Sequence, residues 1–351
     1  MSAPVTISID AMGGDNAPEI VIEGVRLAHV RLPHVRYILF GDERKVSVLF
    51  DRYPDMRGIC TIRHTDQAVS NDSKPGQVLR SGRQSSMWLA VDAVAKGEAA
   101  GVVSAGNTGA LMAVAKFVLR TLPGIDRPAI AGLFPSIRGE TVVLDLGANV
   151  DCDASNLFQF AIMGEVFARA VLGLERPTVG LLNVGSEELK GNDAVKSAAN
   201  ALRDSHLPIS FYGFVEGNDI CAGTVDVVVT DGFTGNIALK TAEGTVKLYS
   251  TFLKQAFGNS ILAKLGYVLA KQALQKVKVR TDPRRYNGAM FLGLNGIAVK
   301  SHGGTDAFGF ANAVGVAVDL VTHGYNERIR HELEEMGSAE RPTTQRASGA
   351  R

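Results

Sequence analysis

The feature that most constrains the fold is the alternation of short β-branched apolar runs with longer segments of helical periodicity along most of the chain. The strand-like runs are 5–9, 37–40, 60–63, 101–104, 129–134, 141–146, 178–184, 209–214, 225–230 and 296–300. The helical segments between them are 19–31, 77–95, 109–119, 157–172, 193–203, 236–257 and 306–323. Such alternation predicts parallel strands with crossover helices. We therefore expect an α/β fold, a three-layer α/β/α arrangement around a Rossmann-like, mostly parallel sheet.

Length and composition limit the organisation of the chain. With 351 residues, 46% of them hydrophobic, it can bury one large core, and we expect a single catalytic domain over 1–336. The polar segment 337–351 has the composition of a disordered tail. The first strand begins almost at once, which leaves no room for a signal peptide, and no apolar run approaches the ~20 residues of a membrane span. We expect a cytoplasmic protein.

Charge and cysteine content exclude several classes of function. The net charge is +1, so the overall balance gives no reason to expect a nucleic-acid partner. Three cysteines without CxxC spacing argue against a disulfide framework or a zinc site. The P-loop, GxGxxG, HExxH and GxSxG signatures are absent from the sequence. We expect no metal and no cofactor, although Asp226 and Asp231 could instead hold magnesium.

The glycine-rich turn after the first strand is the first candidate for ligand binding. The turn places Gly13 and Gly14 between the carboxylates of Asp10 and Asp15 and precedes a helix. Glycines let backbone N–H groups approach a ligand closely, and a helix start favours anions. The alternative interpretation is an ordinary first turn of an α/β domain.

Several other strands also end in glycine and small polar residues. Because ligands bind at the carboxyl ends of strands in open α/β sheets, these loops predict one composite pocket. The candidate binding residues in these loops are Ser104, Gly106, Asn107, Thr108, Asn149, Asn183, Asp231, Thr234 and Gly235.

Three further side chains are candidates for chemistry. Lys190 lies in a glycine-bounded loop after a strand, near Glu187 and Glu188, which favours a role in a site over that of a solvated surface lysine. His302 precedes two glycines and could contact a phosphate or carbonyl group, or be a structural histidine. Asn236 follows Thr234 and Gly235 at the start of a helix, where N–H groups can face an anion.

The segment 247–285 is strongly basic and predicts an amphipathic helical hairpin. Its apolar residues Ile261, Leu262 and Leu265 recur at helical spacing, and apolar residues also occupy the other side. Such a helix needs a partner, which could be a second subunit, an acidic protein or a membrane surface. The only acidic residue in the segment is Asp282, and the basic residues are Lys247, Lys254, Lys264, Lys271, Lys276, Lys278, Arg280, Arg284 and Arg285.

Taken together, these motifs resemble the bacterial phosphate acyltransferases of phospholipid synthesis, the PlsX family. The resemblance extends from residue 5 to about 330. The matching stretches are Ile9-Asp-Ala-Met-Gly-Gly-Asp-Asn-Ala-Pro18, Ser104-Ala-Gly-Asn-Thr-Gly109, Asp145-Leu-Gly-Ala-Asn149, Leu182-Asn-Val-Gly-Ser-Glu-Glu188 with Lys190-Gly-Asn192, Val229-Thr-Asp-Gly-Phe-Thr-Gly-Asn236 and Val299-Lys-Ser-His-Gly303.

The resemblance implies transfer of a fatty acyl group from acyl carrier protein to inorganic phosphate, which gives acyl phosphate. It also implies a homodimer with a fold similar to phosphate acetyltransferases and isocitrate dehydrogenases, working at the cytoplasmic membrane beside a membrane acyltransferase. Lys190 and Asn236 match the positions most closely associated with catalysis in the family, and His302 is a weaker catalytic candidate.

The resemblance also gives the basic hairpin candidate partners. We expect Lys271, Lys276, Lys278 and Arg280 to dock the acidic carrier protein. We expect the tip residues Phe257, Ile261, Leu262 and Leu265 to contact the membrane or the second subunit. The alternatives are an acyltransferase that uses coenzyme A thioesters, a dehydrogenase of the same broad fold, and a non-catalytic acyl or carrier-protein binding module.

Overall fold

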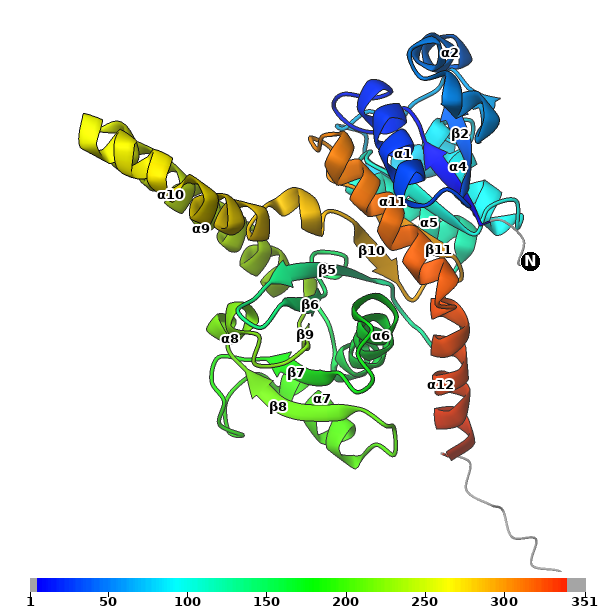
Figure 1. The fold of residues 1–351 in the computed structure, drawn as a ribbon. Helices are drawn as coiled ribbons and strands as arrows, with labels where there is room; N and C mark the ends of the chain where they lie inside the picture. Colours follow the sequence, from blue (N-terminus) through cyan, green and yellow to red (C-terminus); the bar gives the residue numbers. More distant parts are fainter. Residues whose placement is uncertain (1–4, 340–351) are drawn as a thin grey trace, which may run out of the picture.

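The protein is built on one sheet of eleven strands, seen in a computed structural model that describes residues 5–339 (Figure 1). In spatial order the strands are β3-β2-β1-β4-β11-β10-β5-β6-β9-β7-β8. Their bounds are β1 Thr6–Asp10, β2 Arg36–Gly41, β3 Cys60–His64, β4 Gly101–Ser104, β5 Ala129–Pro135, β6 Glu140–Leu144, β7 Thr178–Leu182, β8 Ser210–Val215, β9 Val227–Val229, β10 Ala289–Leu292 and β11 Ile297–Lys300.

Helices cover both faces of this sheet. They are α1 Glu19–Arg31, α2 Glu43–Arg52, α3 Pro75–Ser81, α4 Ser86–Ala95, α5 Thr108–Leu119, α6 Ala154–Leu172, α7 Asp193–Asp204, α8 Gly217–Ala222, α9 Gly232–Gly258, α10 Ile261–Arg280, α11 Ala307–Thr322 and α12 Tyr325–Ala339. One core cluster joins α1, α6, α7, α11 and α12 to the sheet, and a second joins α3, α4, α5, α8 and the first turns of α9 to it. This confirms the predicted three-layer, mostly parallel α/β fold.

The sheet consists of two parallel halves that run in opposite directions. Strands β3, β2, β1, β4 and β11 are parallel to one another, as are β6, β9, β7 and β8. Between the halves, β10 pairs antiparallel with β11 and β5, and β5 pairs antiparallel with β6. Three antiparallel steps reverse the direction of the second half relative to the first.

Most element boundaries agree with the sequence prediction, and the differences have local causes. The segment 77–95, predicted as one helix, is α3 and α4, because Gly82 ends the first and the Ser85 side chain caps the second. The strand β10 and the helices α2, α8 and α12 were not predicted from the sequence. Residues 337–339 of the predicted disordered tail form the end of α12, and the rest of that tail lies outside the described residues.

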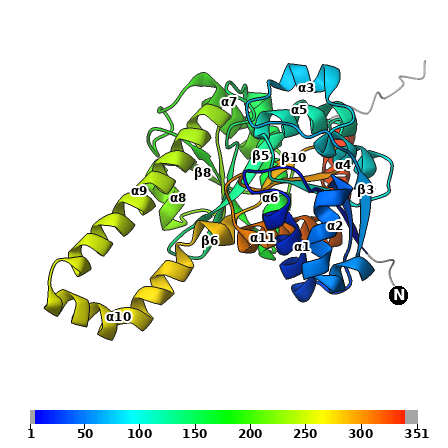
Figure 2. The ribbon, with the colours of Figure 1, turned by 90° about the horizontal axis from the view of Figure 1, so that it is seen from above.

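The helices α9 and α10 form a hairpin that projects from the body of the protein (Figures 1 and 2). Asp231 accepts a hydrogen bond from the Thr234 amide, so α9 begins four residues earlier than predicted. The chain reverses at Asn259 and Ser260, and none of the α10 residues is buried. Within residues 5–339, no helix has the length and apolar character needed to cross a membrane.

Candidate functional site

A first group of loops lies at the carboxyl ends of β1, β4 and β11. We call residues 10–15, 104–108 and 300–303 the first loop group. The buried Asp10 carboxylate accepts a hydrogen bond of 2.7 Å from the Ser104 hydroxyl, and the Asp15 amide donates to the Gly303 carbonyl at 3.0 Å. Burial raises the pKa of Asp10, and the hydrogen bonds it accepts oppose that shift.

The turn in this group requires glycine at Gly13. A Cβ there would lie 2.4 Å from a carboxylate oxygen of Asp10 and 2.7 Å from the Gly106 nitrogen. The neighbouring Gly14 has a φ of +109°, which only glycine adopts without strain. These contacts hold the turn against the β4 loop, as the strand–turn–helix pattern predicts.

Lys300 is a buried cation in the first loop group that the sequence analysis did not select. Its ammonium group donates to the carbonyls of Ala105 and Ser301. Burial lowers the pKa of Lys300 to about 8, although Asp10 and Asp15 favour the charged form. A lysine at the end of an otherwise apolar strand was the available sequence signal.

The polar groups of Asn107 are occupied by the protein itself. Its side-chain oxygen caps α5 at the Ala110 amide, and its amide group donates to the carbonyls of Asn71 and Ser73. These bonds give Asn107 a role in shaping the loop. Thr108 and His302 are exposed, and the His302 Nδ1 accepts a hydrogen bond from the Gly304 amide at 3.1 Å.

A second group of loops lies at the carboxyl ends of β6, β7 and β9. We call residues 145–149, 183–192 and 231–236 the second loop group. Its organising residue is Asp145, which belongs to a matched motif but was not among the selected site residues. This buried carboxylate accepts hydrogen bonds from the amides of Ile130, Gly147, Ala148 and Asn149 and from the Asn149 side chain.

Asn236 connects the start of α9 to this group. Its amide nitrogen donates to the Leu146 carbonyl at 3.0 Å, which occupies one of its two N–H bonds. A Cβ at Gly235 would lie 1.9 Å from the Asp145 carbonyl oxygen, so the start of α9 can approach the β6 loop this closely only with glycine. Thr234 bonds to Asp231 through both its amide and its hydroxyl.

Lys190 is the exposed cation of the second loop group. Its backbone is fixed by a bond from its own amide to the Glu187 carbonyl and by the Asn183 side chain, which donates to the Lys190 carbonyl at 3.2 Å. Glu188 pairs with Arg203 instead of with this lysine. In the part of the chain that the structure describes, the Lys190 ammonium group has no ion-pair partner.

The prediction that both loop groups share one edge of the sheet stays a prediction. Three antiparallel pairings lie between the two halves of the sheet, so the strands of the second half run in the opposite direction to those of the first half in the pairing pattern. Six strand-to-strand pairings separate β1 from β9 in the sheet.

The chemical groups at these loops are an exposed lysine, a histidine, amide groups and helix starts. Cys60, Cys152 and Cys221 are free, and burial raises the pKa of the Cys60 and Cys152 thiols to about 12, which disfavours thiolate nucleophiles. Among residues 5–339 no group of three potential metal ligands occurs. The arrangement can bind an anion and hydrogen-bond a carbonyl oxygen.

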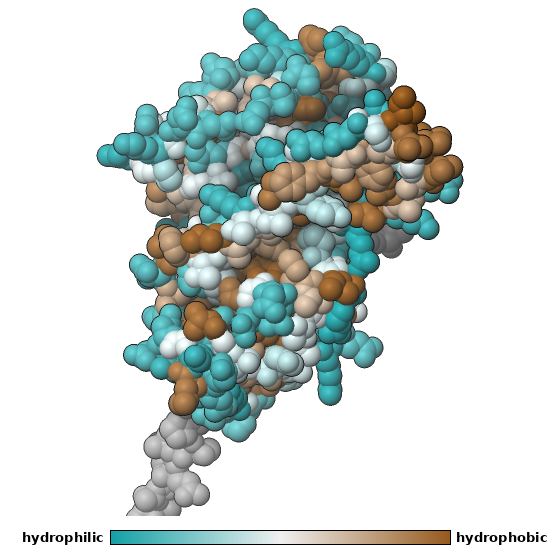
Figure 3. Space-filling model, turned by 90° about the vertical axis from the view of Figure 1, so that its left-hand side faces the viewer, coloured by the Kyte–Doolittle hydropathy of each residue, from teal (hydrophilic) through white to brown (hydrophobic). Residues whose placement is uncertain are grey.

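The basic hairpin presents most of its predicted residues to solvent. Lys271, Lys276 and Lys278 are exposed, whereas the Arg280 guanidinium donates to the Ser136 and Ile137 carbonyls at the base of the hairpin. The remaining predicted residues form the tip. Phe257 packs against Tyr267, Ile261 and Leu262 are 86% and 80% exposed, and Leu265 is exposed as well. Figure 3 shows apolar side chains gathered on this projection.

Comparison with known proteins gives matches over nearly the whole chain. Residues 5–328 match the family described as "Fatty acid synthesis protein". A protein named phosphate acyltransferase from Paramagnetospirillum magneticum is 76% identical over 351 residues, 100% of both chains. One of the same name from Rhodospirillum rubrum is 66% identical over 333 residues, 95% of both chains.

Solved structures share the fold. A phosphotransacetylase from Streptococcus pyogenes has a TM-score of 0.59 at 17% identity, covering 92% of this chain and 95% of the other. The EutD phosphotransacetylase from Staphylococcus aureus has a TM-score of 0.56 at 18% identity, covering 90% and 94%. At this identity the likeness establishes the architecture alone.

Proposed function

The chain belongs to the fatty acid synthesis protein family that includes the bacterial phosphate acyltransferases (PlsX), and we propose that it transfers a fatty acyl group from acyl carrier protein to inorganic phosphate. The product is acyl phosphate for phospholipid synthesis. The observation that carries this proposal is the exposed, unpaired Lys190 on a loop group that also presents the α9 start and Asn236.

The chemistry needs no covalent intermediate on the protein. Phosphate is already an anionic nucleophile: its oxygen attacks the thioester carbonyl carbon, the carbon–sulfur bond breaks, and the thiolate leaves and takes up a proton. The protein's contribution is to hold the two reactants together and to stabilise the oxyanion. In this proposal Lys190 binds phosphate, Asn236 uses its second N–H bond at the oxyanion, and His302 contacts phosphate or supplies the proton.

The other site residues have supporting roles in this proposal. Asp10, Asp15, Asp145 and Asp231 accept hydrogen bonds that fix the loops, and the glycines allow close backbone approach. Thr108 lies exposed at the first turn of α5, where free N–H groups favour an anion. The two loop groups would hold different parts of the substrates.

The exposed lysines of α10 support a carrier-protein partner. Lys271, Lys276 and Lys278 lie on a helix without a buried residue, and an acidic carrier would meet them with complementary charge. Arg280 is the weakest of the four docking candidates because backbone carbonyls already occupy its guanidinium group.

The exposed apolar tip supports contact with the cytoplasmic membrane, beside a membrane acyltransferase, or with the second subunit of a homodimer. Leu262→Glu separates these contacts, because loss of vesicle flotation with an unchanged dimer mass assigns the tip to the membrane. Loss of dimer mass assigns it to the subunit interface. The matched control is Val48→Glu on α2, where Val48 is also an exposed apolar residue. If neither property changes, both assignments are wrong.

The deciding experiment measures phosphate-dependent release of thiol from acyl carrier protein, with acyl coenzyme A as a parallel substrate and with or without magnesium. We expect release from the carrier-protein thioester that depends on phosphate and is unchanged by chelation. Preference for the coenzyme A thioester would favour the alternative donor. Thioester binding without release would instead indicate a non-catalytic binding module, and nicotinamide reduction a dehydrogenase.

A further inference from the structure

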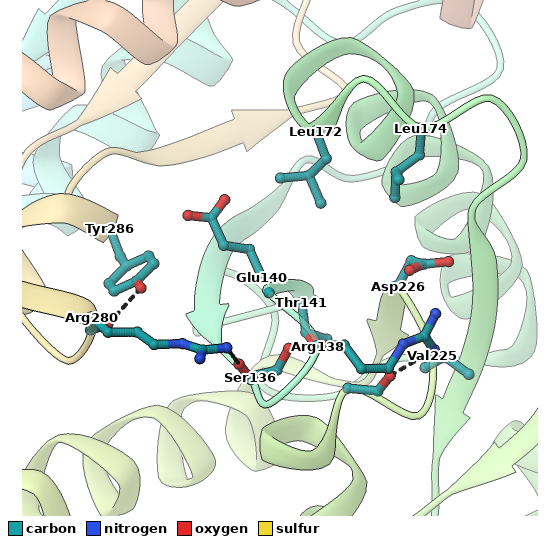
Figure 4. A pocket seen from close by; sticks show the side chains of 12 residues that line it. Ser136, Arg138, Glu140, Thr141, Leu172, Leu174, Val225, Asp226, Arg280 and Tyr286 are labelled. Carbon is teal, nitrogen blue, oxygen red and sulfur yellow. Dashed lines mark hydrogen bonds between the residues drawn. The ribbon is translucent and has the colours of Figure 1, made fainter. Parts of the chain in front are cut away.

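A cavity at the base of the hairpin lies away from both loop groups. It has a volume of about 530 Å³ and sits at the amino ends of β6 and β9, whereas the second loop group follows their carboxyl ends (Figure 4). Four segments line it, 136–141, 172–174, 223–226 and 280–286, the last of which leads out of α10. The volume is within the range of small-molecule sites.

Two buried hydroxyl groups in this cavity have no hydrogen-bond partner in the protein. The side chains of Ser136 and Thr141 are on its wall, and these residues are only 6% and 1% exposed. Neither hydroxyl has a partner among the described residues. Because burying an unpaired hydroxyl is costly, a polar group that enters the cavity and reaches these oxygens would remove that cost.

Two arginines from distant parts of the chain, Arg138 and Arg280, lie on the same side of the cavity as these hydroxyls (Figure 4). Arg138 Nη1 donates to the Gly223 carbonyl at 3.0 Å, and Arg280 Nη2 donates to carbonyls of the β5–β6 turn. The other N–H groups of both guanidiniums have no partner within residues 5–339. A guanidinium with free N–H bonds is suited to a carboxylate or a phosphate.

The rest of the lining limits the ligand further. Leu172 and Leu174 lie on the opposite side of the cavity from the arginines and supply an apolar wall (Figure 4). Two carboxylates, Glu140 and Asp226, offset the two arginines, and Asp226 is bonded to Thr178. This balance disfavours a polyphosphate, and the free N–H groups of the two arginines leave room for one small anionic group.

We propose that this cavity binds a small amphiphilic anion, with a carboxylate or phosphate head at Arg138, Arg280 and the two hydroxyls and a short apolar chain against the leucines. The site is separate from the proposed catalytic loops, and its existence does not depend on their function. A ligand there would bridge the hairpin base and the β5–β6 turn, which Arg280 already joins.

Calorimetric titration of the full chain with hexanoate and hexyl phosphate tests the proposal. We expect both to bind. Hexanol, which lacks the anionic head group, and inorganic phosphate, which lacks the apolar chain, should bind at least about tenfold more weakly. The ratio of hexanoate to hexyl phosphate affinity identifies the preferred head group. Titrations in a Lys190→Ala background separate this binding from binding at the proposed catalytic loops.

Variants of the lining decide where the anion binds. Thr141→Val keeps the side-chain volume and removes the unpaired hydroxyl, and Arg138→Gln removes a cation. Each should weaken binding about tenfold, whereas Arg44→Gln on α2 should leave it unchanged. Melting temperatures verify that the variants fold, and Ser136→Ala replaces Thr141→Val if that variant does not. Absence of binding, as for a cavity that holds only water, or equal affinity in all variants would overturn the proposal.

Discussion

Lys190 and Asn236 differ in their contacts with the rest of the protein, so we expect their substitutions to affect stability differently. The Lys190 ammonium group has no protein partner among residues 5–339, so Lys190→Ala should leave the melting temperature unchanged while reducing turnover. Asn236 also holds the β6 loop through Leu146, so Asn236→Ala should lower both stability and turnover. Loss of one oxyanion donor costs on the order of a hundredfold in rate.

Steady-state kinetics of the purified variants measure this effect, with Lys196→Ala as the control. Lys196 is a lysine on α7 whose ion pair with Asp193 involves an almost fully exposed carboxylate. Near wild-type turnover in both site variants would contradict the proposed roles.

Lys300 gives a prediction about pH and stability. Its pKa of about 8 in the folded protein lies below its ordinary value of 10.5, so between those two pH values the unfolded chain binds more protons. Stability due to this group therefore rises with pH across that window. Relative to Lys300→Met, the wild type should gain on the order of 3 kcal/mol in unfolding free energy between pH 8 and 10.5.

Urea unfolding of both proteins at several pH values measures this difference, because other titrating groups contribute equally to each. A difference between the two proteins that stays constant with pH would show that Lys300 is not desolvated in the way its burial indicates.

At the residue scale, sequence patterns located the loops better than they assigned roles within them. Short polar residues after apolar strands marked every loop of both groups. Asn107 and Thr234 were selected as ligand contacts, yet their polar atoms are bonded within the protein. Asp145 and Lys300 were passed over, because hydrogen bonding and burial depend on segments far apart in the sequence.

At the scale of elements, the hairpin offers a test of the carrier-protein proposal. Replacing Lys271, Lys276 and Lys278 by Glu should raise the KM for acyl carrier protein far more than the KM for phosphate. The reason is that the three new carboxylates would repel the acidic carrier protein at the surface where it docks. Arg280 is left unchanged, because its side chain also holds the β5–β6 turn and its replacement could disturb the structure as well as docking.

The matched control reverses Arg44, Lys45 and Arg52 on α2, which are also exposed cations on one helix. Equal effects on both substrates, or equal effects of the hairpin and α2 reversals, would exclude docking at α10.

Length alone does not separate the elements that were predicted from those that were missed, since the four-residue β4 was predicted and the ten-residue α2 was not. The α1 helix has the bounds that its apolar spacing predicts, and β4 likewise. The strand β10 is only four residues long, and its place between β5 and β11 depends on antiparallel pairing with both. No local pattern of the sequence specifies that pairing.

For the whole molecule, the alternation of strands and helices predicted the layers but not the reversal between the halves. Alternation indicates parallel neighbours, and it contains no information about two antiparallel strands that join separate parallel blocks. Since one core cluster nevertheless extends from β1 and α1 to α6 and β9, we predict that the body unfolds in a single transition, as expected for one domain.

Fluorescence can test this, because the chain has one tryptophan, Trp88, on α4 in the first half. A Trp88→Phe, Phe211→Trp variant moves the probe to β8 in the second half. Coincident urea transitions of the two proteins support one cooperative body. Separate midpoints would divide it into two domains.

The insertion point of the hairpin has a mechanical consequence. The chain enters it from β9, in the second half of the sheet, and leaves it toward β10, in the strip that joins the halves. Its longer arm, the 27 residues of α9, extends about 40 Å. A partner bound at the far end of the hairpin is therefore connected to the sheet through both β9 and β10, so that anchoring the tip would also restrain the orientation of the body.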